Sequence, residues 1–373
     1  MKQSFLFAIA LILNFGYAEA QIFSNKEVGK KNERFIDSLK AAEYPYALPI
    51  WGDKATGMGF NLPYSAGLSV QYFWSESDII IENLMVGFNG GEMYNVDEII
   101  RFNNSVAAAS AVTVRPDIWL FPFLNVYGIL GQAQASTQIN AGLWLPDGEN
   151  NYTEVLPFET QVDFKATTFG LGMTPTIGVG GGFMALDMNV AWTDVPQLDE
   201  PAFSFIFGPR FGKNFKLAKP ERSIAVWVGG FRVHIKSGTN GSVALSDVFP
   251  EGTLGGRVEE GFAKVDNAYD QVNSWWNGLS QAEQNNPINQ AKYEKANSAL
   301  DRASEILVAA DGAIGTIENS TVQYSMDKRV KDMWNFLVGG QFQLNKHFMY
   351  RLEYGFLGSR QQVMTGLQYR FGL

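Results

Sequence analysis

The feature that most constrains this chain is a strict two-residue alternation of side chains, repeated in one segment after another. In residues 336–344, 348–356 and 363–373, large apolar side chains occupy most of the alternate positions, and mainly small or polar side chains stand between them. A period of two is that of a β-strand whose faces meet different surroundings. The connections at 345–347 and 358–360 are short, so we expect these three strands to form consecutive hairpins.

The same alternation recurs upstream, clearly in three segments and less regularly in five more: 64–74, 184–193 and 225–236, then 78–88, 105–116, 121–132, 160–173 and 203–212. The alternation, with aromatic side chains gathered at strand ends, is typical of a membrane barrel that has one face toward lipid and one toward its lumen. A soluble β-sandwich also alternates, but it explains neither the small and polar lumen face nor the aromatic ends.

We therefore predict an all-β fold, a single antiparallel transmembrane β-barrel over residues 64–373. Bacterial barrels usually have an even number of strands. From the eleven segments we expect about twelve strands, so either one strand lies before Tyr64 or one of the eleven is misassigned. Charged residues make up only 18% of the chain, below the roughly 25% usual in soluble proteins. The net charge of −9 argues against a nucleic-acid partner.

The last strand carries a second signal. Gly366, Tyr369 and Phe371 stand at the spacing of a glycine, two residues, an aromatic, any residue and a second aromatic. This ending resembles the assembly signal of Gram-negative outer-membrane β-barrel proteins, although Met364 stands where that signal has a polar residue and residues 372–373 extend beyond its usual end. The resemblance implies insertion by the barrel-assembly machinery and contact with outer-membrane lipid, and it says nothing about cargo.

The first twenty residues are typical of an export signal. Lys2 is followed by an apolar stretch at 5–13, and Ala18-Glu19-Ala20 predicts cleavage near Ala20. The apolar stretch is far shorter than the roughly 20 residues of a membrane-spanning helix. Residues 21–63 then form an N-terminal arm, for which two interpretations stay open: a plug in or against the lumen, or a disordered periplasmic tail.

Between residues 258 and 318 the apolar period changes from two to about 3.5, which predicts an antiparallel pair of helices inserted between two strands. The predicted apolar seam includes Trp276, Tyr293, Leu300 and Leu307. Counting strands back from the C-terminus places this helical hairpin on the extracellular side. It could be a simple surface pair, a lid over the pore or a docking arm for another protein.

The predicted lumen faces carry charged side chains of both signs. The candidates are Arg115, Asp117, Asp187, Arg232, His234, Lys236, Arg351 and Glu353, with Asp163, Lys165 and Arg370 in the same pattern. They could form a polar pathway for a solute, in which Arg232, Lys236 and Arg351 would make an anion-attracting strip. They could equally form an ion-paired network that fills a narrow barrel.

Two functions follow from this arrangement. The first is a gated channel or transporter for a small polar or amphipathic solute, and the second is a membrane-anchored surface protein that presents the hairpin to a partner. A lipid-modifying envelope enzyme is a remote third. The chain has two histidines and no cysteine, with no serine at a catalytic spacing and no acidic calcium loop, so we expect no catalytic residue, cofactor or metal site.

Overall fold

A computed structural model describes residues 33–147, 151–179, 181–196, 198–219, 221–235, 238–248, 253–314 and 320–373. The predicted export signal at residues 1–20 lies outside this part of the chain. Among the described residues, no helix combines the length and apolarity needed to span a membrane.

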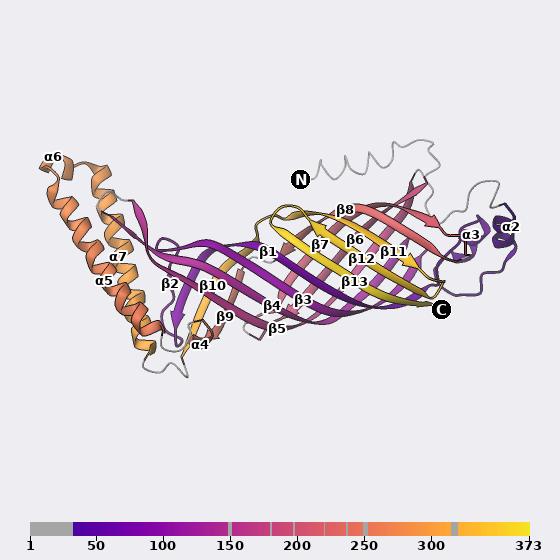
Figure 1. Ribbon diagram of the computed structural model, residues 1–373, viewed down its shortest axis with the longest axis horizontal. Coiled ribbons are helices and arrows are strands. Elements are labelled where there is room, and N and C mark those ends of the chain that lie inside the picture. The colour runs from indigo at the N-terminus through magenta and orange to yellow at the C-terminus, as the bar shows by residue number, and fades with distance from the viewer. Residues whose placement is uncertain are drawn as a thin grey trace.

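Ten antiparallel strands close into a barrel that forms the middle of an elongated molecule (Figure 1). In chain order they are β1 (Ala66–Phe88), β3 (Ile100–Phe121), β4 (Leu124–Pro146), β5 (Tyr152–Val179), β6 (Gly182–Asp194), β7 (Ala202–Lys216), β8 (Ser223–Ile235), β11 (Trp334–Gln343), β12 (Phe348–Phe356) and β13 (Arg360–Phe371). β13 pairs with β1 from Ala66↔Phe371 to Ser77↔Arg360, which closes the ring. The predicted fold class is confirmed, but the ring has ten strands and not about twelve.

The difference in strand number arises in residues 64–88, where the sequence predicts two strands separated by a turn at 75–77. The structure has the single strand β1, because Ser75, Glu76 and Ser77 stay paired with β13 on one side and β3 on the other. Merging the two predicted strands lowers the number from eleven to ten. An even number brings Ala66 and Phe371 to the same end of the ring, which we name the arm end.

At the other end, the hairpin end, the long strands continue beyond the ring. β9 (Gly238–Ala244) follows β8, β10 (Thr321–Val330) precedes β11, and β9 and β10 pair with each other. Past the end of the short β12–β13 hairpin, β10 replaces β13 as the neighbour of β1, from Ile79↔Val330 to Phe88↔Val322. The two-residue strand β2 (Tyr94–Asn95) pairs with β1 at this end.

The outer surface of the ring is an apolar belt. Alternate side chains point away from the interior and are exposed, among them Leu68, Val70, Leu130, Phe169, Phe336, Tyr350, Leu352 and Leu367. A closed ring with such a belt is what a membrane-spanning barrel presents to lipid. The burial patterns confirm the predicted faces of the segments 64–74, 184–193, 336–344, 348–356 and 363–373.

The hairpin end is packed in the opposite way, with an apolar interior and a polar exterior. Its hydrophobic core draws on the extended strands and the helices together, and it includes Ile99, Leu143, Leu145, Val243, Val265 and Leu300. On the outer face of the same strands, the Gln138 amide donates a hydrogen bond to Glu159. This is the arrangement of a water-soluble domain.

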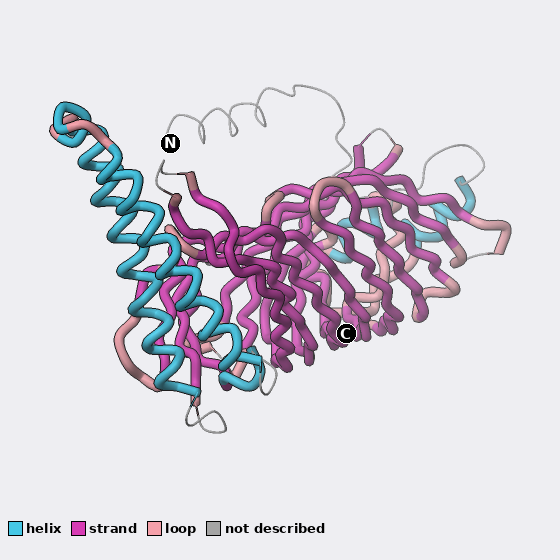
Figure 2. The backbone as a smooth tube through the Cα atoms, turned by 60° about the vertical axis from the view of Figure 1, so that its left-hand side comes forward, coloured by secondary structure: helices cyan, strands magenta, loops and turns pink. Residues whose placement is uncertain are grey.

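The helical hairpin closes this core. It consists of α5 (Thr253–Gly278), α6 (Gln281–Gln284) and α7 (Pro287–Ile314), preceded by α4 (Leu245–Val248). Figures 1 and 2 show it leaving the barrel obliquely, with α6 at the far tip. The predicted helical insert is confirmed: Leu300 is fully buried, Leu307 is nearly so, and the Trp276 and Tyr293 rings stack with centroids 4.5 Å apart.

The N-terminal arm lies at the arm end and holds α2 (Glu33–Ala41) and α3 (Gly52–Gly57) (Figure 1). The Leu48 amide donates to the Leu373 carbonyl at 3.3 Å, and the Ile50 amide donates to the Leu120 carbonyl at 2.9 Å. These bonds attach the arm both to residue 373 and to the last turn-proximal residues of β3. Burial raises the pKa of the Tyr44 hydroxyl in this segment to about 12.

Candidate functional site: the polar lumen

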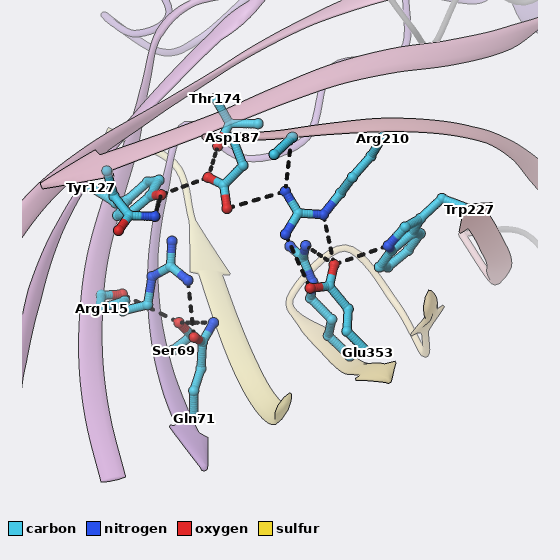
Figure 3. A network of polar contacts seen from close by, with 12 residues as sticks. Ser69, Gln71, Arg115, Tyr127, Thr174, Asp187, Arg210, Trp227 and Glu353 are labelled. Carbon is cyan, nitrogen blue, oxygen red and sulfur yellow. Dashed lines mark hydrogen bonds and ion pairs between the residues drawn. The ribbon is translucent and has the colours of Figure 1, made fainter. Parts of the chain in front are cut away.

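The interior of the ring is polar at the level of the apolar belt, and its side chains bond to one another across the lumen (Figure 3). At its centre lie Tyr127, Asp187, Arg210, Arg351 and Glu353, which we name the central cluster. Arg210 links the two carboxylates: its Nη1 lies 3.2 Å from Asp187 Oδ2 and its Nε lies 2.8 Å from Glu353 Oε1. The Tyr127 hydroxyl donates to Asp187 Oδ1 at 2.6 Å. The cluster therefore ties together β4, β6, β7 and β12, which are not all neighbours in the ring.

Glu353 is the most enclosed group of the central cluster, with 1% of its surface exposed. Its carboxylate accepts hydrogen bonds from Arg210 Nη2 at 3.1 Å and from Trp227 Nε1 at 2.9 Å, and Arg351 also donates to it. A buried carboxylate needs such charged donors, because desolvation of an unpaired charge costs several kcal/mol. The buried charges of the network are thus paired with one another across the lumen.

Arg115 of β3 lies beside the central cluster, and no carboxylate of the described chain forms an ion pair with it. Its Nη1 donates to Gln71 Oε1 at 3.0 Å, and its guanidinium carbon lies 3.9 Å from the centroid of the Tyr127 ring. A contact with an aromatic face holds a cation in place without neutralising it. Arg115 therefore adds a positive charge to the lumen.

A second polar group lies nearer the arm end. Arg370 Nη1 is 3.0 Å from Asp117 Oδ1, and this carboxylate also accepts from the amides of Asn125 and Gln368, each at 2.7 Å. Arg370 Nε donates to the Tyr64 carbonyl at 3.0 Å, just before β1 begins. The pair joins β3 to β13 close to the place where the N-terminal arm lies.

Cations outnumber carboxylates on the inward faces of the described strands. The cations are Arg115, Arg210, Lys328, Arg351, Arg360 and Arg370, and the carboxylates are Asp117, Asp187 and Glu353. Lys328 donates to the Thr137 hydroxyl at 3.3 Å, and Arg360 lies over the Phe231 ring. Lys328 lies beyond the ring. Within the ring the other five cations outnumber the three carboxylates, so the lumen is positive although the whole chain has a net charge of −9.

Five of the predicted lumen candidates lie inside the barrel and in its polar groups: Arg115, Asp117, Asp187, Arg351 and Glu353. The prediction is wrong for Arg232 and His234, which are exposed on the outward side of β8. Lys236 lies outside the described residues. Of the described members of the expected anion-attracting strip, Arg351 faces the lumen and Arg232 does not.

The faces of β8 are reversed because this strand turns its aromatic side chains inward. Trp227 and Phe231 are almost fully buried inside the barrel. The Trp227 indole lies against Gly339 of β11, where a side chain on that residue would collide with it, so a glycine is needed for this close approach. The opposite face of β8 then meets the belt, with Ile224, Val226 and Val228 exposed.

The sequence analysis did not identify three of the inward-facing cations. Arg210 bridges the central cluster, but it lies in a segment whose alternation is irregular; its flanking glycines, Gly208 and Gly212, were the available signal of a lumen face. Lys328 and Arg360 lie in stretches that the sequence predicts to be connections. The structure instead pairs them with β1 at Ile81↔Lys328 and Ser77↔Arg360.

The remaining predicted positions lie away from the central cluster. On β13, Gly366 faces inward against Gln71, whereas Tyr369 and Phe371 are exposed on the belt. His347 lies in the β11–β12 turn, with Nδ1 2.7 Å from the Arg370 carbonyl. Within the part of the chain that the structure describes, no group of three or more histidine, aspartate or glutamate residues is arranged to hold a metal ion.

No family model matches this chain, and no curated protein matches it. Among solved structures it is similar to the β domain of the Bordetella autotransporter BrkA (10% identity, TM-score 0.29, covering 82% of this chain and 100% of that chain). It is also similar to the translocator domain of the autotransporter NalP from Neisseria meningitidis (8%, 0.30, 92% and 94%) and to a FadL homologue from Pseudomonas aeruginosa (6%, 0.26, 95% and 100%). Because these TM-scores lie below 0.5, the assignment as a membrane barrel rests on the strand pairing and the apolar belt.

Proposed function

We propose that the protein resides in the outer membrane of a Gram-negative bacterium and conducts a small, negatively charged polar solute. The excess of inward-facing cations over carboxylates supports this proposal most strongly. Cationic side chains around a narrow pore attract anions and repel cations. In this arrangement the hairpin end faces outside the cell and the arm end faces the periplasm.

The central cluster acts as the gate. Glu353 holds Arg210 and Arg351 together, and Arg210 also binds Asp187. While these ion pairs stand, the two arginines are occupied and the bore is filled. When Glu353 loses its partners, the same arginines become binding groups for a passing anion, so that one set of side chains serves for closure and for selectivity.

A conductance measurement tests this proposal. Glu353→Gln keeps the shape of the side chain and its ability to hydrogen-bond, but it removes the charge that holds Arg210 and Arg351. In planar bilayers we expect the wild type to conduct weakly and Glu353→Gln to raise the current by roughly tenfold, the effect of about 1.4 kcal/mol on the gating equilibrium. Deletion of residues 258–318 should also raise the current, because in this proposal the helical hairpin closes the hairpin end of the barrel.

Glu82→Gln is the matched control. Glu82 lies on the outer face of β1 and pairs with Arg329 at 3.3 Å, so its removal changes the same charge outside the lumen and should leave the current unchanged. If neither the wild type nor Glu353→Gln nor the hairpin deletion conducts any ion, the channel proposal must be dropped.

A surface interaction protein is the second candidate, and the exposed apolar side chains of the hairpin favour it. Ile288 and Val308 on α7 are both largely exposed, although a surface pair of helices needs apolar groups only at its seam. A photo-crosslinking residue at 288 in intact cells should then capture one protein partner. Leu300→Asp, which breaks the seam, should abolish the product, whereas an unselective set of products would contradict this function.

A further inference from the structure

A groove of about 660 Å³ lies on the wall formed by β1, β3, β4 and β5, outside the polar lumen. Its lining combines an aromatic ring, hydroxyl and amide groups and one charge of each sign: Trp74, Ser110, Gln134, Ser136, Asp163 and Lys165. Ala108 pairs with Ser136, and these two short side chains form the floor. The groove is therefore a hollow with both polar and aromatic groups.

The strand register places this lining on the outside of the barrel. Trp74 pairs with Ser110, Ser110 with Gln134, and Gln134 with Lys165, and directly paired residues of adjacent antiparallel strands share a face. Asp163 stands two residues before Lys165 and so lies on the same face. The sequence predicts Asp163 and Lys165 to face the lumen, and that prediction is wrong.

The groove lies on the external side of the apolar belt. Leu130 of β4 and Phe169 of β5 are exposed belt residues on the same outer face, and Gln134 and Lys165 stand four residues farther toward the hairpin end. Four residues span about 13 Å of a strand, and the tilt of the strands shortens this height to the level of lipid head groups. In the proposed orientation the hairpin end is outside the cell, so the groove faces the lipid of the external leaflet.

One side of the groove carries a cation and a hydrogen-bond acceptor at a fixed spacing. Lys165 and Asp163 are two residues apart on one strand, so their side chains leave the backbone about 7 Å from each other. The Gln161 amide donates to Asp163 Oδ1 at 3.0 Å, and a carboxylate can accept several further donors. A phosphate alone would satisfy Lys165 but would be repelled by Asp163. A phosphorylated sugar would satisfy both, because its hydroxyl or amide groups donate to the carboxylate.

Trp74 lies at the opposite side of the groove. It stands on β1 and Lys165 on β5, with β3 and β4 between them, so their backbones are about 14 Å apart at three strand spacings. An aromatic ring at a membrane interface offers an apolar face, on which the apolar face of a sugar ring can pack. The separation of Trp74 from Lys165 exceeds the width of one sugar ring and suits a disaccharide that carries a phosphate.

We propose that this groove binds lipid A, the acylated and phosphorylated glucosamine disaccharide of the external leaflet. One phosphate binds Lys165, hydroxyl or amide groups of the sugar donate to Asp163, and the apolar face of a sugar ring packs on Trp74. The acyl chains then run down the belt past Leu130 and Phe169. This inference rests on the proposed location in the outer membrane with the hairpin end outside, and it does not depend on whether the barrel conducts.

Native mass spectrometry of the full chain in detergent micelles tests the site with three defined lipids. Lipid A brings phosphate and sugar, dioleoylphosphatidylglycerol brings phosphate without sugar, and monoglucosyl dioleoylglycerol brings sugar without phosphate. We expect lipid A to bind most tightly, because it alone engages both Lys165 and Asp163. No current is measured, so failure of this test leaves the conductance test unaffected, and a barrel that conducts nothing can still bind lipid A here.

Two substitutions separate the phosphate from the sugar. Lys165→Ala should weaken lipid A and phosphatidylglycerol by roughly tenfold, as the loss of a charge-assisted hydrogen bond predicts, and should leave the glucosyl lipid unchanged. Asp163→Asn should weaken lipid A and the glucosyl lipid, also by roughly tenfold, and should not weaken phosphatidylglycerol. Both side chains are exposed on the outer face, so neither substitution removes a buried contact of the fold.

Arg329→Ala is the control, because it removes an outward cation of β10 that is already paired with Glu82 and does not line the groove. It should leave all three affinities unchanged. The proposal is overturned if either Lys165→Ala or Asp163→Asn behaves like this control toward lipid A. It is also overturned if phosphatidylglycerol binds as tightly as lipid A, which would indicate a site for phosphate alone.

Discussion

The ring and the hairpin end are built from the same strands, yet their interiors are opposite in kind. Within the ring, Tyr127 of β4 faces an ion-paired lumen while Leu130 faces outward. Farther along β4, Leu143 lies in a hydrophobic core and Gln138 is exposed. One strand thus serves as a membrane wall and then as part of a water-soluble domain.

This difference shows that the medium that each strand face meets determines whether that face carries apolar or polar side chains. Lipid outside the ring requires apolar outward groups, so the polar side chains gather inside and must satisfy one another. Water outside the hairpin end reverses both requirements. The outer face changes from apolar to polar at one level of the barrel. Four paired residues mark this level: Trp74, Ser110, Gln134 and Lys165.

The largest expected effect comes from breaking the polar interior. Arg210→Ala leaves Asp187 and Glu353 buried without their shared partner, and the loss of one member of a buried ion pair typically costs about 3–5 kcal/mol. We expect the free energy of unfolding, measured with urea on the barrel in micelles, to fall by this amount. A loss below about 1 kcal/mol would mean that water in the lumen already solvates both carboxylates.

The matching change in the apolar interior is Leu300→Ala. Leu300 is fully buried where the two helices meet the strands, and truncation of such a leucine costs about 2–5 kcal/mol. Proteolysis should then cleave the hairpin while the ring stays folded and resistant. If the ring unfolds together with the hairpin, the two regions form one cooperative unit. That result would contradict the view that the ring and the hairpin end are stabilised separately.

The boundary between the two regions can be tested on one strand. Leu130→Arg places a charge on the belt and should cost about 2 kcal/mol, within the range for lipid-facing arginines. Gln138→Arg, on the same outer face beyond the boundary, should cost nothing measurable. Equal losses of stability for the two variants would show that the belt extends farther than the structure indicates.

The smallest effect concerns Lys328, whose position on β10 lies beyond the ring. Burial lowers the pKa of its ammonium, so it loses its proton at a lower pH than an exposed lysine does. The preference for anions should therefore fall as the pH rises through that lowered pKa. Lys328→Gln should remove this step from the pH profile of the reversal potential, and a profile identical to that of the wild type would exclude Lys328 from the pathway.

Much of the ring could be predicted from the sequence, because lipid imposes a strict period of two on β12, β13 and most of β11. The prediction is wrong where that rule does not hold. Ser75 to Ser77 resemble a turn, yet they continue β1 across the level where the outer face becomes polar. Trp227 resembles a belt residue, yet the space above Gly339 lets it enter the lumen.

The candidate site was predicted less completely than the fold, for a physical reason. A strand pattern indicates which face a residue occupies, but not which distant residue stands opposite. Arg351 and Glu353 share a strand face, so the sequence predicts that they lie together. Their link to Arg210 depends on closure of the ring, which brings β7 across from β12.

The most direct test of the central claim is the reversal potential of Glu353→Gln channels under a tenfold gradient of potassium chloride. An excess of lumen cations predicts a reversal potential shifted toward the chloride equilibrium potential. The shift should shrink when Arg115, which forms no ion pair with a carboxylate of the described chain, is also replaced by glutamine. A reversal potential near zero, or one shifted toward the potassium equilibrium potential, would contradict the proposal that the positive lumen selects its solute.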